Sequence, residues 1–274
     1  MRLYRYLNAF SIDVVAGAVI CSLFFAKLFQ ANLPTVLVVS LAMAVWSVYS
    51  IDHLWDAQRS PMPSITLRHH LHFKYRPILT LLLFVVLVTG GILFWYLPDS
   101  TRRMGLILAL SIIVYFLTTT FWGSKPIYHK ELSIAAAYSF GVILGPYTLR
   151  QIQMTTPHML VCIQFAMLAF SNLLIFSYFD TELDQKQHFG SLSRAIGKWN
   201  TRLLAIVMLL LVLVTSIFGF INWYEDTLIR QGQWVLALMT IPLATTLVWH
   251  TYFRHCERYR LLGDITFFVP ILIL

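Results

Sequence analysis

The sequence has few charged residues. Asp, Glu, Lys and Arg make up only 12% of its 274 residues, whereas 58% are hydrophobic. The mean hydropathy is +0.72. A soluble domain of this composition could not cover its apolar surface with polar side chains and would aggregate. The composition therefore excludes a soluble globular domain and predicts a polytopic membrane protein.

Cysteine is also scarce, and the familiar short motifs are absent. The three cysteines, Cys21, Cys162 and Cys256, lie in or beside apolar runs without CxxC spacing. We interpret them as small buried residues rather than as a disulfide or metal set. The sequence lacks a glycine-rich phosphate loop, zinc-finger spacing and a repeat of fixed period. The net charge of +8 is spread among the loops, which does not favour nucleic-acid binding.

Nine apolar runs organise the chain. Eight are long enough to cross roughly 30 Å of hydrocarbon, and the ninth is shorter and contains Pro270. The runs lack the alternation of barrel strands, so helices must satisfy their backbone groups in lipid. We expect an all-α, polytopic membrane bundle of nine transmembrane helices, forming a single domain over residues 1–274. The runs lie at about 10–30, 33–51, 77–97, 104–122, 132–149, 158–179, 202–222, 233–253 and 262–274.

Lysine and arginine are distributed unevenly between the two ends of these runs. With nine spans, fifteen of the 20 lie on the side of the N-terminus. The positive-inside rule then places the N-terminus in the cytoplasm, together with two long connections at about 52–76 and 180–201. No convincing small-residue cleavage site follows the first run, so we interpret it as a membrane helix rather than a signal peptide. We expect a multi-pass protein of a bacterial inner membrane.

Two acidic stretches lie at the ends of the second and sixth runs. Asp52 and Asp56 are four residues apart, and so are Asp180 and Asp184. Residues at this spacing share one face of a helix, whereas Glu182 would point away from its neighbours. Four facing carboxylates would repel one another unless a divalent metal or cations neutralised them. The sequence therefore predicts that the two stretches form one site.

These features resemble the UbiA superfamily of intramembrane prenyltransferases, nine-helix proteins with aspartate-rich motifs after helices two and six. The segment DTELD at 180–184, followed by GSLSRAIG at 190–197, is similar to the family's D-x-E-x-D run and its downstream G-x-x-S/T. The family's first motif reads N-D-x-x-D-x-x-x-D, but Val48 and Tyr49 stand where its asparagine and first aspartate belong. The chain thus resembles a divergent member with a shortened first motif.

The resemblance implies Mg2+-dependent transfer of a polyprenyl group from its diphosphate to an aromatic or lipid acceptor. It implies that Asp52 and Asp56 hold one Mg2+, and that Asp180 and Asp184 hold another. Mg2+ suits sparse carboxylate ligation completed by water and phosphate oxygens, and an apolar cavity would keep water from the allylic carbocation. No protein partner is implied. The residues expected to bind the substrate are Arg59, Arg68, Lys74, Lys125, Tyr128, Lys130, Lys186 and Asn172.

Five histidines near the acidic stretches leave alternatives open. Histidine and carboxylate together bind iron or zinc, which would make the protein a metal-dependent membrane oxidase or hydroxylase. The histidines could instead lie at the membrane interface, bond to the carboxylates or contact the diphosphate. A third class is a non-catalytic UbiA-like lipid-binding or accessory protein, which the shortened first motif suggests. The histidines are His53, His69, His70, His72 and His188.

Two more carboxylates lie near the starts of apolar runs. Asp13 is early in the first run and Asp264 is early in the last. A charge in hydrocarbon is costly, so each needs a partner, a cavity or a place at the membrane interface.

Overall fold

A computed structural model describes residues 2–59, 67–122, 130–187, 190–223 and 225–274, and over these residues every regular element is a helix. The predicted all-α class is confirmed. The elements are α1 (Arg2–Ala9), α2 (Ile12–Leu28), α3 (Thr35–Arg59), α4 (Leu67–Lys74), α5 (Arg76–Phe94), α6 (Asp99–Trp122), α7 (Lys130–Thr148), α8 (Thr156–Gln187), α9 (Leu192–Ile196), α10 (Lys198–Asn222), α11 (Thr227–Val248), α12 (His250–Arg254), the 3-10 helix η1 (His255–Glu257), α13 (Arg258–Ile265) and the 3-10 helix η2 (Thr266–Ile273).

Each predicted apolar run coincides with a helix, but six of the described helices are both long and apolar enough to cross a membrane. These are α3, α5, α6, α8, α10 and α11. Helix α2 has only 17 residues, and α7 contains many small and polar side chains. The ninth run is divided between α13 and η2, and its Pro270 has no backbone N–H to donate. The count of nine spans is therefore not confirmed, although the protein has the helices of an integral membrane protein.

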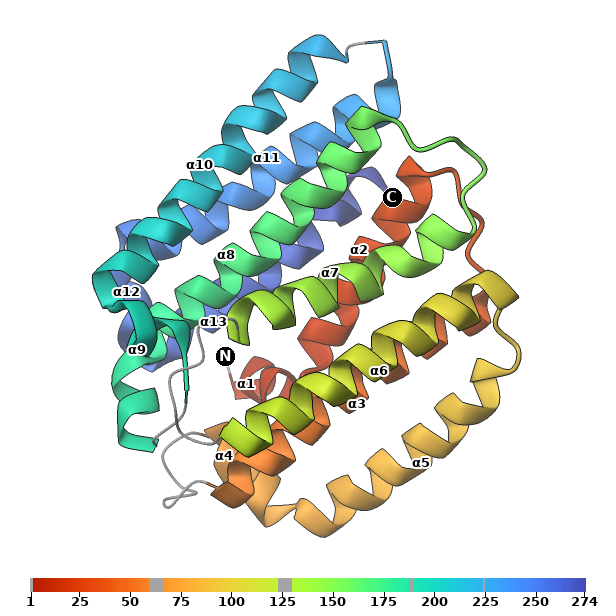
Figure 1. Cartoon of the computed structure of the whole chain (residues 1–274). Coiled ribbons are helices and arrows are strands. Elements are labelled where there is room, and N and C mark those ends of the chain that lie inside the picture. Colours follow the sequence, from red (N-terminus) through yellow and green to blue (C-terminus); the bar gives the residue numbers. More distant parts are fainter. Residues whose placement is uncertain (1, 60–66, 123–129, 188–189, 224) are drawn as a thin grey trace.

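The helices form one bundle in which α2 and α7 are central (Figure 1). Helices α8, α10 and α11 pack against one another, and α7 lies between α8 and α6. Helix α2 contacts α7 and α3, and α3 in turn contacts α5 on the outside of the bundle. Helix α5 exposes large apolar side chains, among them Ile78, Leu81 and Phe84. Such a surface suits contact with lipid tails rather than with water.

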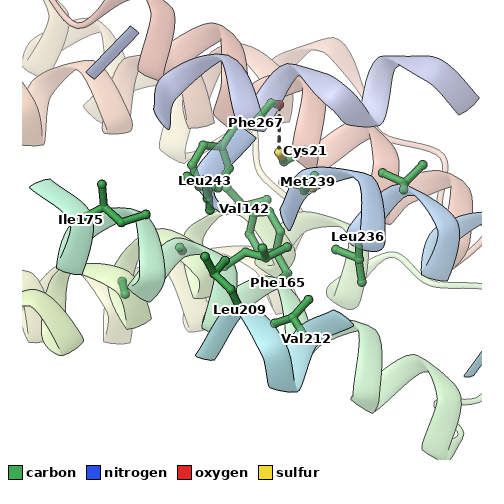
Figure 2. Close-up of a cluster of buried hydrophobic side chains, with 14 of the residues drawn as sticks. Cys21, Val142, Phe165, Ile175, Leu209, Val212, Leu236, Met239, Leu243 and Phe267 are labelled. Carbon is green, nitrogen blue, oxygen red and sulfur yellow. Dashed lines mark hydrogen bonds between the residues drawn. The ribbon is translucent and has the colours of Figure 1, made fainter. Parts of the chain in front are cut away.

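The buried core lies where α2, α7, α8, α10, α11 and η2 meet. Figure 2 shows Phe165 of α8 among side chains from several of these helices. The thiol of Cys21 donates a hydrogen bond to the carbonyl oxygen of Phe267 at 3.3 Å, which joins α2 to η2. Cys21 is therefore buried as predicted. Cys162 is only partly buried, and the prediction is wrong for Cys256, which is exposed because it lies in the short turn between α12 and α13.

Both acidic stretches lie near the C-terminal ends of long helices. Asp52 and Asp56 lie on α3, and Asp180 and Asp184 lie on α8. Helix α7 begins with Lys130 at this end of the bundle, which we call the acidic end.

Candidate functional site

The two acidic stretches come together around the first residue of α7. Lys130 lies within electrostatic range of Asp56 and Asp52 on α3, and of Asp184 on α8. These carboxylates are far apart in the sequence, and only the packing of α3 and α8 beside α7 places them around one cation. The charge of Lys130 reduces the repulsion among them. Lys130 thus interacts with carboxylates of both stretches, and that all four carboxylates form one site stays a prediction.

Asp180 is held by the C-terminal helix α13. Nη2 of Arg260 donates to Oδ2 of Asp180 at 2.5 Å, and the hydroxyl of Tyr259 donates to Oδ1. The side chains of Asp180 and Arg260 are each only 16% exposed. Burial raises the pKa of the Tyr259 hydroxyl, and the charge of Arg260 only partly offsets this, so Tyr259 stays protonated and can donate. Charge-assisted bonds of this kind are among the strongest in proteins.

Sequence reasoning missed Arg260 and Tyr259 as site residues. Arg260 contributed only to the count of positive charges on one side of the membrane. The sequence does contain a signal for a polar site here. The segment ERYR at 257–260, with two arginines and a tyrosine, directly precedes the last apolar run. What sequence could not show is that this segment returns to α8.

A glycine allows α13 to approach α8. Asn172, which was predicted to bind substrate, lies about two turns before Asp180 on α8 and is buried. A Cβ atom on Gly263 would collide with Oδ1 of Asn172 and would lie 2.7 Å from Cε1 of Phe176. The Oδ1 atom of Asn172 has no hydrogen-bond partner among the described atoms. The absence of a side chain at Gly263 thus permits the contact that places Arg260 beside Asp180.

Glu182 faces away from the site, as the helix geometry predicts. It is exposed, with its oxygens 2.5 Å from Arg254 and 3.4 Å from Lys198. Lys186, one turn further along α8, is also exposed. The face of α8 that bears Asp180 and Asp184 is therefore distinct from its outer face.

The segment after α8 folds back onto that helix. Oε1 of the buried Glu131, next to Lys130, accepts a hydrogen bond from the backbone N–H of Leu192 at 2.7 Å. The backbone N–H of Ser193 donates to Oγ of Ser177 at 3.1 Å. The hydroxyl groups of Ser193 and Thr181 are 2.5 Å apart. The serine downstream of the second acidic stretch thus has a structural role in closing this segment against α8.

Two of the five histidines pack together beside the first acidic stretch. Nδ1 of His53 lies 3.9 Å from Oδ2 of Asp52, and Nε2 of His53 shares a hydrogen bond with Oγ of Ser11 at 3.2 Å. The ring centroids of His53 and His72 are 5.2 Å apart, and both side chains are buried. These contacts join α2, α3 and α4.

The described part of the chain has no cluster of three metal ligands for any ion. Among the described side chains, no group of three or more His, Cys, Asp or Glu residues is arranged to hold a metal ion. His70 is exposed. His188 and the side chain of His69 lie outside the described residues.

The other predicted substrate-binding residues are only partly described. Lys74 is exposed at the end of α4, with Nζ 5.3 Å from the ring centroid of Tyr75. Arg59 and Arg68 lie on α3 and α4, but their side chains fall outside the described part. Lys125 and Tyr128 lie outside it altogether.

A second pair of carboxylates is joined by one amide. Nδ2 of Asn8 donates to Asp13 at 2.8 Å and to Asp264 at 2.7 Å, and both aspartates are buried. The hydroxyl of Tyr4 donates to Asp13 at 3.0 Å. Burial, with the charges of Asp264 and Asp13, raises the pKa of Tyr4, which keeps the hydroxyl protonated. The partners that Asp13 and Asp264 require thus come from α1.

Comparison with known proteins establishes the fold. No protein-family model and no curated protein sequence matches the chain. A UbiA homologue from Archaeoglobus fulgidus bound to GPP and Mg2+ matches with a TM-score of 0.68 and 11% identity over 98% of each chain. A UbiA homologue from Archaeoglobus fulgidus bound to DMAPP and Mg2+ matches with a TM-score of 0.65 and 12% identity. This match covers 98% of this chain and 100% of the homologue. The apo structure of a UbiA homologue from Aeropyrum pernix K1 matches with a TM-score of 0.62 and 13% identity. This match covers 93% of this chain and 97% of the homologue.

These matches cover nearly the whole of each chain. The protein therefore has the fold of the UbiA homologues, and the resemblance seen in the aspartate motifs is confirmed at the level of the fold. Because the identities are low, the activity does not follow from the fold alone.

Proposed function

We propose that the protein is an intramembrane, Mg2+-dependent prenyltransferase that moves a polyprenyl group from its diphosphate to an aromatic or lipid acceptor. The observation that supports it best is the convergence of both acidic stretches around Lys130 in a chain of UbiA fold. The GPP and Mg2+ bound to the Archaeoglobus fulgidus homologue support the substrate class and the metal. The proposed topology has the N-terminus and the acidic end in the cytoplasm, in a bacterial inner membrane.

The acidic residues fit Mg2+. We assign Asp52 and Asp56 to one ion, and Asp180 and Asp184 to the other. Mg2+ is usually held by one or two carboxylates, with waters and substrate phosphates completing its shell, so a cage of three protein ligands is not required. When bound, Mg2+ would neutralise the charge that develops on the leaving diphosphate.

The chain's own cations complete the diphosphate site. Lys130 interacts electrostatically with carboxylates of both stretches, and Arg260 forms an ion pair with Asp180. A diphosphate brings negative charge to this position, so both side chains can donate hydrogen bonds to its oxygens while the carboxylates turn to the metal. Asn172 and Lys74 are further contacts in this proposal, whereas the predicted contact of Lys186 is not retained, because Lys186 is exposed on the outer face of α8. Arg59, Arg68, Lys125 and Tyr128 are supported by the sequence pattern alone.

Packed aromatic rings exclude water from one side of Asp180. The ring of Tyr259, which donates to Asp180, stacks on Phe179 with centroids 4.4 Å apart. Both rings are buried. Exclusion of water here strengthens the electrostatic interactions of the site and protects a carbocation from hydrolysis.

The test is binding of radiolabelled geranyl diphosphate to the detergent-purified full chain, with and without Mg2+, together with elemental analysis. We expect Mg2+-dependent binding that Asp52→Asn and Asp180→Asn each weaken at least tenfold. Asp99→Asn is the matched control, because Asp99 is 72% exposed and pairs with Arg102 on α6. Bound iron or zinc without diphosphate binding would overturn the proposal and favour a metal site formed by the histidines.

A second candidate is a non-catalytic UbiA-like lipid-binding or accessory membrane protein. Val48 and Tyr49, which replace the first two polar residues of the first motif, favour it. It predicts retention of prenyl lipid that neither Mg2+ removal nor Asp180→Asn affects.

A further inference from the structure

An apolar groove lies on the outer face of the bundle between α10 and α11. Its volume is about 220 Å³. Helix α10 contributes Ile206, Leu209 and Leu213 to its lining, and α11 contributes Ala244 and Leu247. Arg202 is the charged residue of this lining and lies at one end of the groove. This surface is separate from the acidic stretches, which lie on α3 and α8.

The groove has the length of a lipid chain in one leaflet. From Arg202 to Leu213 along α10, a rise of 1.5 Å per residue gives about 16 Å. Half of the hydrocarbon thickness of a bilayer is about 15 Å. Lys198, one turn before Arg202, contacts Glu182 near the end of α8, so Arg202 is at the acidic end of the bundle. The groove therefore runs from the membrane surface at that end to the middle of the bilayer.

Arg202 brings an uncompensated charge to the polar end of the groove. Its Nη2 atom donates to the backbone carbonyl of Leu247 at 3.1 Å, and its guanidinium lies 5.8 Å from the ring centroid of Trp199. Its Nε atom is buried without a hydrogen-bond partner among the described atoms. In the described part of the chain Arg202 forms no ion pair, whereas the nearby Lys198 pairs with Glu182. A guanidinium that pairs with no carboxylate can accept an anionic group as its partner.

The exposed tryptophan places this arginine at the membrane surface. Trp199 is 70% exposed beside Arg202, and Trp249 is 60% exposed just beyond the end of α11. Tryptophan in such positions is typical of the level of the lipid headgroups, where the phosphates also lie. An apolar groove beneath a headgroup-level arginine matches the two parts of a phospholipid.

We propose that the groove binds an anionic glycerophospholipid of the surrounding bilayer, with its phosphate on Arg202 and one acyl chain along the groove. A phosphodiester has one negative charge, which one guanidinium matches. A prenyl diphosphate has more charge and needs metal ions or several cations, which the acidic site offers and this groove does not. The inference does not depend on the proposed prenyltransferase activity.

Native mass spectrometry of the delipidated full chain tests this proposal. Phosphatidylglycerol and phosphatidylcholine with identical acyl chains are titrated. Both carry the phosphodiester, but the quaternary ammonium of phosphatidylcholine cancels its net charge. We expect one phosphatidylglycerol to bind about tenfold more tightly than phosphatidylcholine. Arg202→Gln should abolish this preference. Arg150→Gln should retain it, because Arg150 also donates to a backbone carbonyl and lies over a ring, that of Tyr147, but is outside the groove.

A second variant protects the test if Arg202→Gln does not fold. Ala244→Phe fills the groove and leaves its charge unchanged, so phosphatidylglycerol binding should fall about tenfold as well. Ala109→Phe is the control, because Ala109 is exposed on α6 away from the groove.

Several outcomes would overturn the assignment. Equal binding of the two lipids would exclude a preference for a net anionic headgroup, and equal losses in Arg202→Gln and Arg150→Gln would exclude recognition of the phosphate by Arg202. Displacement of the lipid by geranyl diphosphate would assign the groove to the prenyl substrate. A dimer that Ala244→Phe dissociates would assign it to a second copy of the chain.

Discussion

Arg260 of α13 and Asp180 of α8 form a direct ion pair, with Nη2 and Oδ2 2.5 Å apart, although 80 residues separate them in the sequence. The pair joins the C-terminal helix to the second acidic stretch. A divalent ion that binds Asp180 must share the carboxylate with the guanidinium or displace it. Arg260 is therefore positioned to respond when metal and diphosphate bind.

Replacing Arg260 by glutamine should destabilise the metal-free protein. The change removes the positive charge beside a largely buried carboxylate, which an uncharged amide compensates less well, and this costs about 1–3 kcal/mol. Mg2+ with geranyl diphosphate should restore part of the loss, because the metal supplies the missing positive charge. Thermal unfolding in detergent, with and without these ligands, measures both effects. Arg258→Gln is the control, since the Arg258 guanidinium lies 4.4 Å from the ring centroid of Tyr252, and equal shifts in both variants would contradict the expectation.

Adding one methyl group at Gly263 should separate α13 from α8. The new Cβ would lie 2.7 Å from Cε1 of Phe176, so the helices must move apart and Arg260 must shift from Asp180. We expect Gly263→Ala to lower the melting temperature and to weaken diphosphate binding. Gly105→Ala should be neutral or stabilising, because a Cβ there meets nothing within 4 Å and alanine favours a helix. Unchanged melting and binding in Gly263→Ala would show that the close approach does not position Arg260.

Glu131 should matter for its hydrogen bond rather than for its charge. Its Oε1 atom accepts from Leu192 N–H at 2.7 Å, and the side chain is only 5% exposed. Glu131→Ala leaves this N–H without its partner and should cost about 1–3 kcal/mol. Glu131→Gln keeps an acceptor and should retain most of the stability. Limited proteolysis of the segment after α8 reads out the difference, and equal cleavage of the two variants would contradict the role assigned to the acceptor.

Two buried glutamines should stabilise the packing of α8 against α11. Nε2 of Gln164 donates to Oε1 of Gln233 at 2.9 Å, and both side chains are fully buried. A double-mutant cycle with Gln164→Leu and Gln233→Leu should give a coupling of about 0.6–2 kcal/mol, as found for hydrogen bonds between membrane helices. The cycle is measured by unfolding in detergent. Additive effects would show that the two amides act independently.

Helix formation and the spacing of the acidic residues could be predicted from sequence. A long apolar run in hydrocarbon must satisfy its own backbone hydrogen bonds, so each of the nine runs coincides with helical structure. The spacing of Asp52 and Asp56, and of Asp180 and Asp184, places each pair on one helix face for the same local reason. The shorter α2 and the divided last run show why the number of spans did not follow from hydropathy alone.

By itself, the sequence determined the all-α class, the membrane character and two acidic helix faces, because these depend on composition and on contacts within a few residues. Only the tertiary structure decided that Lys130 lies between the faces, that α13 brings Arg260 to Asp180, and that Arg202 ends an apolar groove. Those contacts join helices that are distant along the chain. They depend on how closely the helices approach, which side-chain shapes at positions such as Gly263 decide and no local pattern reveals.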